Sequence, residues 1–360
     1  MATEAGTGRS ATEGAVLSPE TFPDVFADED HLEDFMSTPT QALIDDLAEL
    51  EGDIAILGVG GKMGPTLARM VKRAAPAKRV LGVARFTEPG VRERLESWGV
   101  ETRVCDLLDR DEVAAIPKLP NVIYMAGKKF GTEGAADLTW AMNTYVPALV
   151  GEAFPESRIV AFSTILVYPY TSVLHQGSVE SDPPYAQPGE YANSCIGRER
   201  MFEYFSRKNG TPVCTLRLAY SIDMRYGVLH EIATKVFNGE TIDLTTGHVN
   251  VIWQGDANAQ AVRALRHCET PPKPIIISGP ETVSIRALAV SIGRRLGKEP
   301  VFAGTESETC CLVNAGHSAD LFGYPTVPLD RMIAWIADWV ATGKLSWGKP
   351  CHYETRNGVF

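Results

Sequence analysis

The glycines of one short segment have a spacing that could hold a diphosphate. Gly58, Gly61 and Gly64 follow the apolar run 53–58 and lead into a helical pattern at 63–74. Glycine permits a tight turn and lets a phosphate approach the backbone, and the helix N-terminus supplies unpaired N–H groups and partial positive charge. This strand-to-helix context predicts a dinucleotide site, the alternative being a turn that holds nothing. The residues expected at the pyrophosphate are Gly58, Gly61, Lys62, Met63 and Gly64.

The end of the second predicted strand bears on which dinucleotide would bind. NAD-preferring sites usually carry Asp or Glu there, about 20 residues beyond the glycines. Here Ala84 stands in that place and Arg85 follows it. The lost carboxylate and the added guanidinium favour the 2′-phosphate of NADP(H), and Lys62 would add charge on the same side. We therefore expect NADP, with NAD as the second choice. If Arg85 is only a solvated surface residue, this preference loses its basis.

Asp106 and Leu107 follow the third predicted strand. A carboxylate at this position can accept a hydrogen bond from the adenine amino group. It can equally serve as the N-cap of a following helix. We retain both interpretations and include Asp106 and Leu107 among the expected cofactor residues.

Short apolar runs alternate with helical patterns over most of the chain. Such alternation implies parallel crossover connections, and hence an α/β fold with a Rossmann-type, doubly wound parallel sheet. The predicted strands are 53–58, 80–84, 102–105, 121–125, 158–163, 213–219 and 274–278. The predicted helices are 40–50, 63–74, 91–98, one from about 138 to beyond 150 with a bend at Pro147, 191–208, 229–237, 257–266, 284–296 and 329–342.

Three regions are expected. Residues 1–35 are rich in small, acidic and turn-forming residues, a composition that predicts a mobile arm with no core of its own. Residues 36–220 form the dinucleotide-binding domain. Residues 221–360 form mainly a small substrate-binding lobe, with elements that return to the sheet and cover its carboxyl edge, where ligands of open α/β sheets bind.

The composition excludes several classes of protein. A net charge of −11 argues against broad binding to nucleic acid or anionic membranes. No apolar run reaches the length of about 18 residues that a membrane span needs, and we see no secretory signal. The seven cysteines contain no CxxC pair, which favours reduced thiols in a cytoplasmic protein. The histidines lack metal-ligand spacing, so we expect no metal.

Further motifs occur in the order typical of one family. They are Met125-Ala126-Gly127 at the end of the fourth predicted strand, Asn143 in the next helix, Ser163–Tyr168, Asp256 and Gly323-Tyr324-Pro325. With the glycine segment, they make the chain, from about residue 53 to 342, resemble the extended short-chain dehydrogenase/reductase family, in its branch of NAD-dependent epimerases and dehydratases. The resemblance adds Ala126, Gly127 and Asn143 to the expected cofactor residues.

The catalytic pair of that family is a Tyr and a Lys four residues later. By resemblance, Tyr191 is the general acid or base and Thr164 supplies the hydroxyl that orients the reacting oxygen. Cys195, however, stands where the family has its Lys. A neutral thiol gives no positive charge to stabilise a phenolate, so the usual lowering of the tyrosine pKa is lost. A buried inert thiol suits Cys195 better than a nucleophile.

Three interpretations of this YxxxC pattern are open. Another cation replaces the Lys, and Lys128, which with Lys129 follows the fourth predicted strand, is the candidate. Alternatively, an unperturbed Tyr191 suffices, or the site is inactive. Lys128 could also be a solvated surface residue, and Tyr191 a packing aromatic. Arg198 lies about 10 Å along the helix from Tyr191, too far for direct contact, and is set aside.

The expected function is that of an atypical NAD(P)-dependent oxidoreductase or epimerase/dehydratase. It would transfer a hydride to or from a carbinol or ketone carbon of a sugar or sugar-derived small molecule. No basic cluster for a substrate diphosphate is evident, which favours a free sugar or a polyol-like substrate. The rival hypothesis is an inactive NADP(H)-binding sensor or scaffold. The resemblance also implies a homodimer, formed through the helices before and within the Tyr191 segment.

Overall fold

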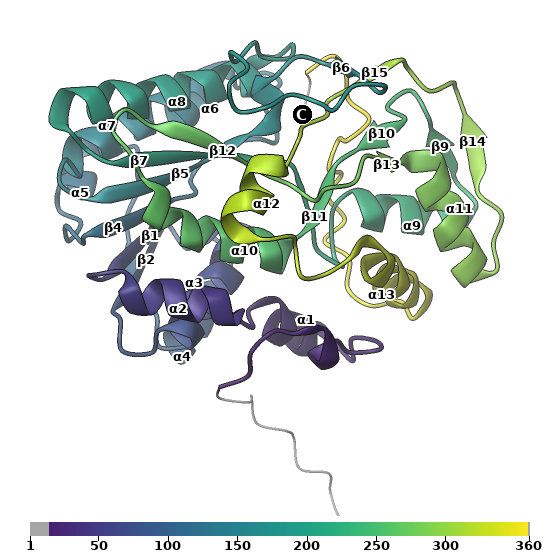
Figure 1. The fold of residues 1–360 in the computed structure, drawn as a ribbon, viewed down its shortest axis with the longest axis horizontal. Helices are drawn as coiled ribbons and strands as arrows, with labels where there is room; N and C mark the ends of the chain where they lie inside the picture. Colours follow the sequence, from purple (N-terminus) through teal and green to yellow (C-terminus); the bar gives the residue numbers. More distant parts are fainter. Residues whose placement is uncertain (1–13, 359–360) are drawn as a thin grey trace, which may run out of the picture.

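A seven-stranded parallel sheet forms one half of the computed structural model, which describes residues 14–358 (Figure 1). Its strand order is β12-β7-β5-β4-β1-β2-β3. The order reverses between β1 and β4, the point at which open α/β sheets bind ligands. The strands are β1 (Ile54–Leu57), β2 (Val80–Ala84), β3 (Glu101–Val104), β4 (Asn121–Tyr124), β5 (Arg158–Thr164), β7 (Val213–Leu218) and β12 (Lys273–Ile277).

Helices cover both faces of this sheet because its central strands are apolar on both sides. One hydrophobic core lies under α2 (Gln41–Glu49), α3 (Gly64–Ala74), α4 (Val91–Ser97) and α10 (Gln254–Arg263). The core of the opposite face lies under α5 (Arg110–Ala114), α7 (Val146–Ala153) and α8 (Glu190–Asn209). The predicted doubly wound, Rossmann-type α/β fold is confirmed.

The helix predicted from residue 138 is continuous but not regular. It consists of α6 (Ala136–Trp140), the π-helical turn η2 (Ala141–Tyr145) and α7. Pro147 lies just beyond the π-helical turn. A proline ring would clash with the carbonyl four residues earlier in a regular α-helix, and that carbonyl belongs to Asn143. The widened turn relieves this clash, so the irregularity lies one turn before the predicted bend.

The second lobe is built around three helices, α9 (Val228–Asn238), α11 (Ile285–Leu296) and α13 (Leu329–Ala341), which share one hydrophobic core (Figure 1). Four two-stranded sheets surround or join them, and most of their short strands were not predicted. These pairs are β8 (Tyr220–Ile222) with β11 (Val251–Trp253), β9 (Thr241–Asp243) with β14 (Val301–Ala303), β10 (His248–Val249) with β13 (Val283–Ser284), and β6 (Thr171–Ser172) with β15 (Thr309–Cys310). Apart from α1 (Glu29–Met36), the remaining elements are η1 (Pro19–Thr21), η3 (Ile165–Val167), η4 (Ala264–His267) and α12 (Gly316–Phe322).

The expectation of an arm without a core is wrong for the described part of residues 1–35. Leu17, Phe26 and Leu32 are buried in the core of the second lobe, and α1 (Glu29–Met36) is a helix capped by Asp28. The ring of Phe26 lies 5.0 Å from that of Trp335. Composition hid this because the few large apolar residues are diluted by acidic and small ones. Residues 1–13 lie outside the described residues.

Two further features concern residues 14–358 alone. None of their helices combines the length and the apolar character that a membrane crossing requires. Nor do their His, Cys, Asp and Glu side chains gather in a group of three that could hold a metal ion.

Candidate functional site

Two cavities lie at the carboxyl edge of the sheet, and residues of the glycine loop line both of them. We name the first the glycine-loop cavity; it is lined by Gly58, Gly61, Arg85, Asp106, Leu107, Ala126 and Gly127, among others. We name the second the tyrosine cavity; it encloses about 190 Å³ and is lined by Lys62, Lys129, Ser163, Thr164, Tyr191 and Tyr226, among others. Most of the predicted cofactor residues line the glycine-loop cavity, and two predicted catalytic residues, Thr164 and Tyr191, line the tyrosine cavity.

The three spaced glycines differ in what a side chain would contact at each position. Gly58 has φ +90°, and a Cβ there would lie 2.6 Å from the Ala126 nitrogen. A Cβ on Gly64 would collide with the Val59 carbonyl. Gly61 is different, because its Cβ would meet only the Gly58 oxygen, at 3.6 Å. Packing therefore demands glycine at 58 and 64 but not at 61, where the missing side chain leaves a cradle that a diphosphate fits.

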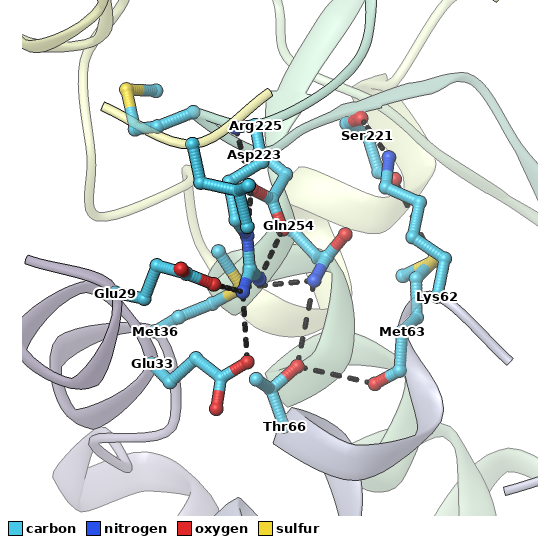
Figure 2. A network of polar contacts seen from close by, with 12 residues as sticks. Glu29, Glu33, Met36, Lys62, Met63, Thr66, Ser221, Asp223, Arg225 and Gln254 are labelled. Atoms are coloured by element: carbon cyan, nitrogen blue, oxygen red, sulfur yellow. Dashed lines mark hydrogen bonds and ion pairs between the residues drawn. The ribbon is translucent and has the colours of Figure 1, made fainter. Parts of the chain in front are cut away.

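Lys62 does not lie on the same side as Arg85, contrary to the sequence expectation. Its Nζ donates a hydrogen bond of 3.1 Å to the Ser221 oxygen (Figure 2). The same Nζ lies 4.2 Å from the centre of the Tyr226 ring. The side chain thus leaves the loop toward the tyrosine cavity, away from the glycine-loop cavity. The neighbouring Met63 sulfur contacts the Ser221 hydroxyl at 3.5 Å. Arg85 therefore has no neighbouring Lys62 charge in the glycine-loop cavity, and the expected preference for NADP had relied on both cations.

Asp106 belongs to the glycine-loop cavity and is not a helix cap. The N-cap of α5 is Asp109, whose carboxylate accepts from the backbone N–H groups of Asp111 and Glu112. Asp106 instead accepts a hydrogen bond from the backbone of Leu108 at 3.0 Å. The N-cap interpretation is therefore wrong, and the contact with adenine stays a proposal.

Asn143 does not face either cavity. Its oxygen accepts from the Lys128 backbone N–H at 2.8 Å and from Arg198 Nη2 at 2.7 Å. Its nitrogen donates to the Lys128 oxygen and to the Ser194 hydroxyl. These bonds use both donors and both acceptor positions of the amide. The structure therefore corrects the expected cofactor contact: Asn143 fixes the backbone that follows Gly127, which does line the glycine-loop cavity.

The two predicted catalytic hydroxyls lie together in the tyrosine cavity. Thr164 is the last residue of β5 and Tyr191 the second of α8, and the Thr164 hydroxyl is a hydrogen-bond partner of the Tyr191 phenol. Burial raises the pKa of Tyr191, and the neighbouring Cys195 raises it further. The positive charge of Arg198 and the hydrogen bond to Thr164 offset this rise in pKa only in part. The phenol is therefore a proton donor at neutral pH.

The lysine that lines the tyrosine cavity is the residue after the one predicted to replace the missing cation. Lys128 Nζ turns back to the Phe130 oxygen, at 2.9 Å, and Lys128 is not among the residues that line the tyrosine cavity. Lys129 lines that cavity, and its Nζ donates to the Cys351 oxygen at 3.3 Å. Its charge also acts on the Cys195 thiol. The structure thus places Lys129, not Lys128, in the cavity that Tyr191 lines.

Arg198 provides a second positive charge behind Tyr191. Side chains on a helix lean toward its N-terminus, so the guanidinium reaches back from position 198 along α8. It is buried and donates to the Phe162 oxygen at 2.8 Å as well as to Asn143. Its charge acts on both the Tyr191 phenol and the Cys195 thiol. Burial raises the pKa of Cys195, which agrees with an inert thiol.

Several residues of the tyrosine cavity had no signal in the sequence. Tyr220 and Tyr226 come from β8 and the turn after it, and Cys351 comes from a segment close to residue 358. None belongs to a motif, and only the folded chain brings them beside Tyr191.

Comparisons with known proteins agree with this geometry. Residues 54–242, which include both cavities' main motifs, match the profile of the NAD dependent epimerase/dehydratase family. The fold is similar to UDP-glucose 4-epimerase from Thermus thermophilus in complex with NAD, at 18% identity and a TM-score of 0.66, covering 79% of this chain and 98% of that one. It is also similar to UDP-glucuronic acid 4-epimerase from Bacillus cereus in complex with UDP-glucuronic acid and NAD, at 18% identity and a TM-score of 0.67, covering 81% and 99%. No curated protein sequence matches the chain.

The likeness to these two structures, at such identities, shows the fold. The family profile does more, because it spans more than half of the chain and includes the glycine loop, Thr164 and Tyr191. The resemblance noted in the sequence is therefore confirmed, and with it an enzyme fold that uses a nicotinamide dinucleotide. The chain belongs to the NAD-dependent epimerase/dehydratase family, within the extended short-chain dehydrogenase/reductases.

Proposed function

We propose that the chain oxidises and re-reduces a carbinol carbon of a sugar, in an epimerisation, a dehydration or a simple oxidoreduction. The observation that carries this proposal is the pairing of the Tyr191 phenol with the Thr164 hydroxyl in a cavity next to the glycine loop. A bound nicotinamide would accept and return the hydride. The protein would supply the proton transfers and hold the reacting oxygen.

Each hydroxyl has a distinct task in this proposal. Tyr191 gives its proton to the sugar oxygen during reduction and takes it back during oxidation. Thr164 donates to the same oxygen and fixes its position. Arg198 supplies positive charge at the phenol, and Lys129 acts on the adjacent Cys195 thiol, in place of the ammonium that Cys195 cannot provide. We assign these two cations a positioning role and Lys128 none.

We propose NAD, not NADP, as the cofactor. The Glu88 carboxylate lines the glycine-loop cavity together with Arg85, and a carboxylate disfavours a 2′-phosphate. Lys62, the second cation expected there, lies in the other cavity. The structurally similar epimerases from T. thermophilus and B. cereus were both found with NAD.

Dissociation constants for the two dinucleotides test the cofactor proposal. We expect tighter binding of NAD, and we expect Glu88→Gln to narrow the difference because the repulsive carboxylate is gone. Tighter binding of NADP by the unmodified protein would contradict the choice of NAD and restore the role first expected for Arg85.

A sugar substrate is supported by the similar structures, whose names specify UDP-glucose and UDP-glucuronic acid. Candidate sugars, free and nucleotide-linked, can be incubated with the protein and NAD and their products identified by NMR, because an epimerase leaves no net change in reduced cofactor. We expect conversion of at least one sugar, and we expect Tyr191→Phe to slow it by about 10²–10⁴-fold while NAD still binds.

The same comparison separates an enzyme from a sensor. A sensor would bind NAD and convert none of the sugars, and Tyr191→Phe would leave its affinity for NAD unchanged. Unchanged conversion by Tyr191→Phe would remove Tyr191 from the chemistry.

We also propose a homodimer, as the family resemblance implies. The helices around the Tyr191 segment carry large apolar side chains that are exposed in the single chain. These are Leu138, Trp140, Tyr145 and Tyr204. Light scattering should give twice the chain mass, and Tyr204→Arg should shift the protein toward the monomer. A monomeric unmodified protein at high concentration would contradict the dimer.

A further inference from the structure

Two lysines enter the tyrosine cavity from different elements. Lys62 reaches it from the glycine loop, and Lys129 from the segment after β4. The described residues that line this cavity include no aspartate or glutamate. The positive charge of Lys129 also lowers the pKa of Lys62. Two like charges in one cavity repel each other, and an anion bound between them would relieve that repulsion.

The Lys62 ammonium has polar neighbours but no ion-pair partner among residues 14–358. Asp223 is the nearby carboxylate, and both of its oxygens are taken by Arg225, at 3.0 and 2.9 Å (Figure 2). Arg225 in turn bonds Glu33 of α1 at 2.9 Å. The negative charge of Asp223 is therefore largely compensated by Arg225. Lys62 keeps its remaining N–H donors for the cavity.

Lys129 lies against the C-terminal segment and the aromatic wall of the cavity. Its Nζ donates to the Cys351 oxygen and lies 6.0 Å from the centre of the Tyr220 ring. Glu231 acts on it electrostatically, and the Glu231 carboxylate accepts from the Cys351 backbone N–H. Glu231 does not line the cavity. The cavity itself thus presents two ammonium groups beside the Tyr191 and Thr164 hydroxyls.

We propose that the tyrosine cavity binds an anionic monosaccharide whose carboxylate or phosphate lies between Lys62 and Lys129. This inference rests on the proposed function, since it places the sugar's reacting carbon at Tyr191 and its charged group at the lysines. A cavity of about 190 Å³ is smaller than the roughly 300–1,000 Å³ of common ligand pockets, which suits one sugar ring better than a nucleotide sugar.

Calorimetry with simple sugars tests the site without requiring turnover. Galacturonate, galactose 6-phosphate and neutral galactose are titrated into the unmodified full-length protein, Lys62→Gln, Lys129→Gln and the surface control Lys298→Gln, all saturated with reduced NAD. We expect the anionic sugars to bind the unmodified protein at least about tenfold more tightly than galactose, and each cavity variant to lose most of that margin. The Lys298→Gln variant should keep it, because Lys298 is exposed on the second lobe. The two anionic sugars distinguish a carboxylate site from a phosphate site.

A pH series on the unmodified protein gives a second test that no folding defect can obscure. Burial lowers the pKa of Lys62 to about 8, against the opposing effects of Asp223 and Cys351, while Lys129 and Arg225 lower it further. Burial likewise lowers the pKa of Lys129. Affinity for the anionic sugar should therefore fall as pH rises through about 8, since the ammonium loses its charge. Affinity for galactose should stay level.

The outcomes separate this inference from the proposed function. Lysine-dependent binding of an anionic sugar without conversion of any sugar would support the site and contradict the function. Conversion of neutral sugars with no preference for anionic ones would do the reverse. If Lys62→Gln instead weakens NAD itself and leaves sugar discrimination unchanged, Lys62 serves the cofactor and the proposed site is wrong.

Discussion

At the scale of single residues, the unusual feature is a buried acid–base tyrosine without its lysine. Cys195 occupies the lysine position and is fully buried. Burial and the thiol together raise the pKa of Tyr191, and Arg198 offsets this only in part. The phenol therefore starts as an acid, which suits the reduction half of the reaction and makes the oxidation half dependent on pH.

This gives a pH dependence with a definite sign. The single-turnover rate of sugar oxidation should increase by about tenfold per pH unit up to at least about pH 9, because the deprotonated phenol remains a minor species below its raised pKa. The reverse reduction should be level over the same range. Absorbance of the reduced nicotinamide follows both. An oxidation rate that levels off near neutral pH would mean that another group is the base.

Sequence reasoning at this scale succeeded where a motif specifies a backbone position and failed where side-chain direction decides. Thr164 and Tyr191 meet as expected. Lys128 and Lys129 are adjacent in the chain, yet only Lys129 lines the cavity, because β4 has ended and the strand alternation no longer predicts direction. The prediction for Lys62 was also wrong about direction. Its spacing placed it correctly in the glycine loop but did not show which cavity its side chain enters.

At the scale of elements, a buried amide is one of the links between α8 and the helix before it. Asn143 lies on η2 and links the loop after β4 to Ser194 and Arg198 of α8. The amide thus connects the backbone next to the glycine-loop cavity with the helix that bears Tyr191. Its sequence signal was read as a cofactor contact because family order gives the position but not the hydrogen-bond partners.

Replacing this amide should cost stability. Asn143→Ala leaves the Lys128 N–H and Arg198 Nη2 without their acceptor, so unfolding free energy should fall by about 2 to 3 kcal/mol in urea denaturation. The same substitution at Asn209, an exposed residue at the end of α8, should change it by less than about 0.5 kcal/mol. Equal effects of the two substitutions would show that the Asn143 network carries no special weight.

The main elements were predictable because their apolar patterns are long or lie between turn residues. All seven strands of the parallel sheet begin and end within a few residues of expectation, and so do the flanking helices except α5, which was not predicted. The short strands of the second lobe were not predictable, because segments of two or three residues such as His248–Val249 contain no periodicity to detect.

At the scale of the whole molecule, the N-terminal segment and the second lobe form one unit. Phe26 packs among Trp253 and Trp335, and the Trp335 indole donates to the Pro23 oxygen at 2.8 Å. Through Glu33 and Arg225, the same segment reaches Asp223, whose charge acts on Lys62 (Figure 2). Composition alone could not reveal this, because the partners lie far apart along the chain.

Phe26→Ala should therefore destabilise the second lobe as a core substitution does. We expect a loss of about 3–5 kcal/mol in unfolding free energy, because the buried ring leaves a cavity among large aromatic side chains. Phe237→Ala, which truncates an exposed ring on α9, should cost less than about 1 kcal/mol. Thermal unfolding of both variants measures the contrast. A Phe26→Ala variant as stable as the unmodified protein would restore the loose arm that composition suggested.

The most direct test of the central claim, a dinucleotide held by the glycine loop, is calorimetric titration of NAD into the unmodified protein and Gly61→Val. The Cβ of the introduced valine would lie 3.6 Å from the Gly58 oxygen, an ordinary van der Waals contact, so the variant should fold. We expect NAD to bind the unmodified protein and to bind Gly61→Val at least about tenfold more weakly, because the side chain would occupy the cradle of the diphosphate. Equal affinities, or no binding by the unmodified protein, would contradict a dinucleotide at this loop.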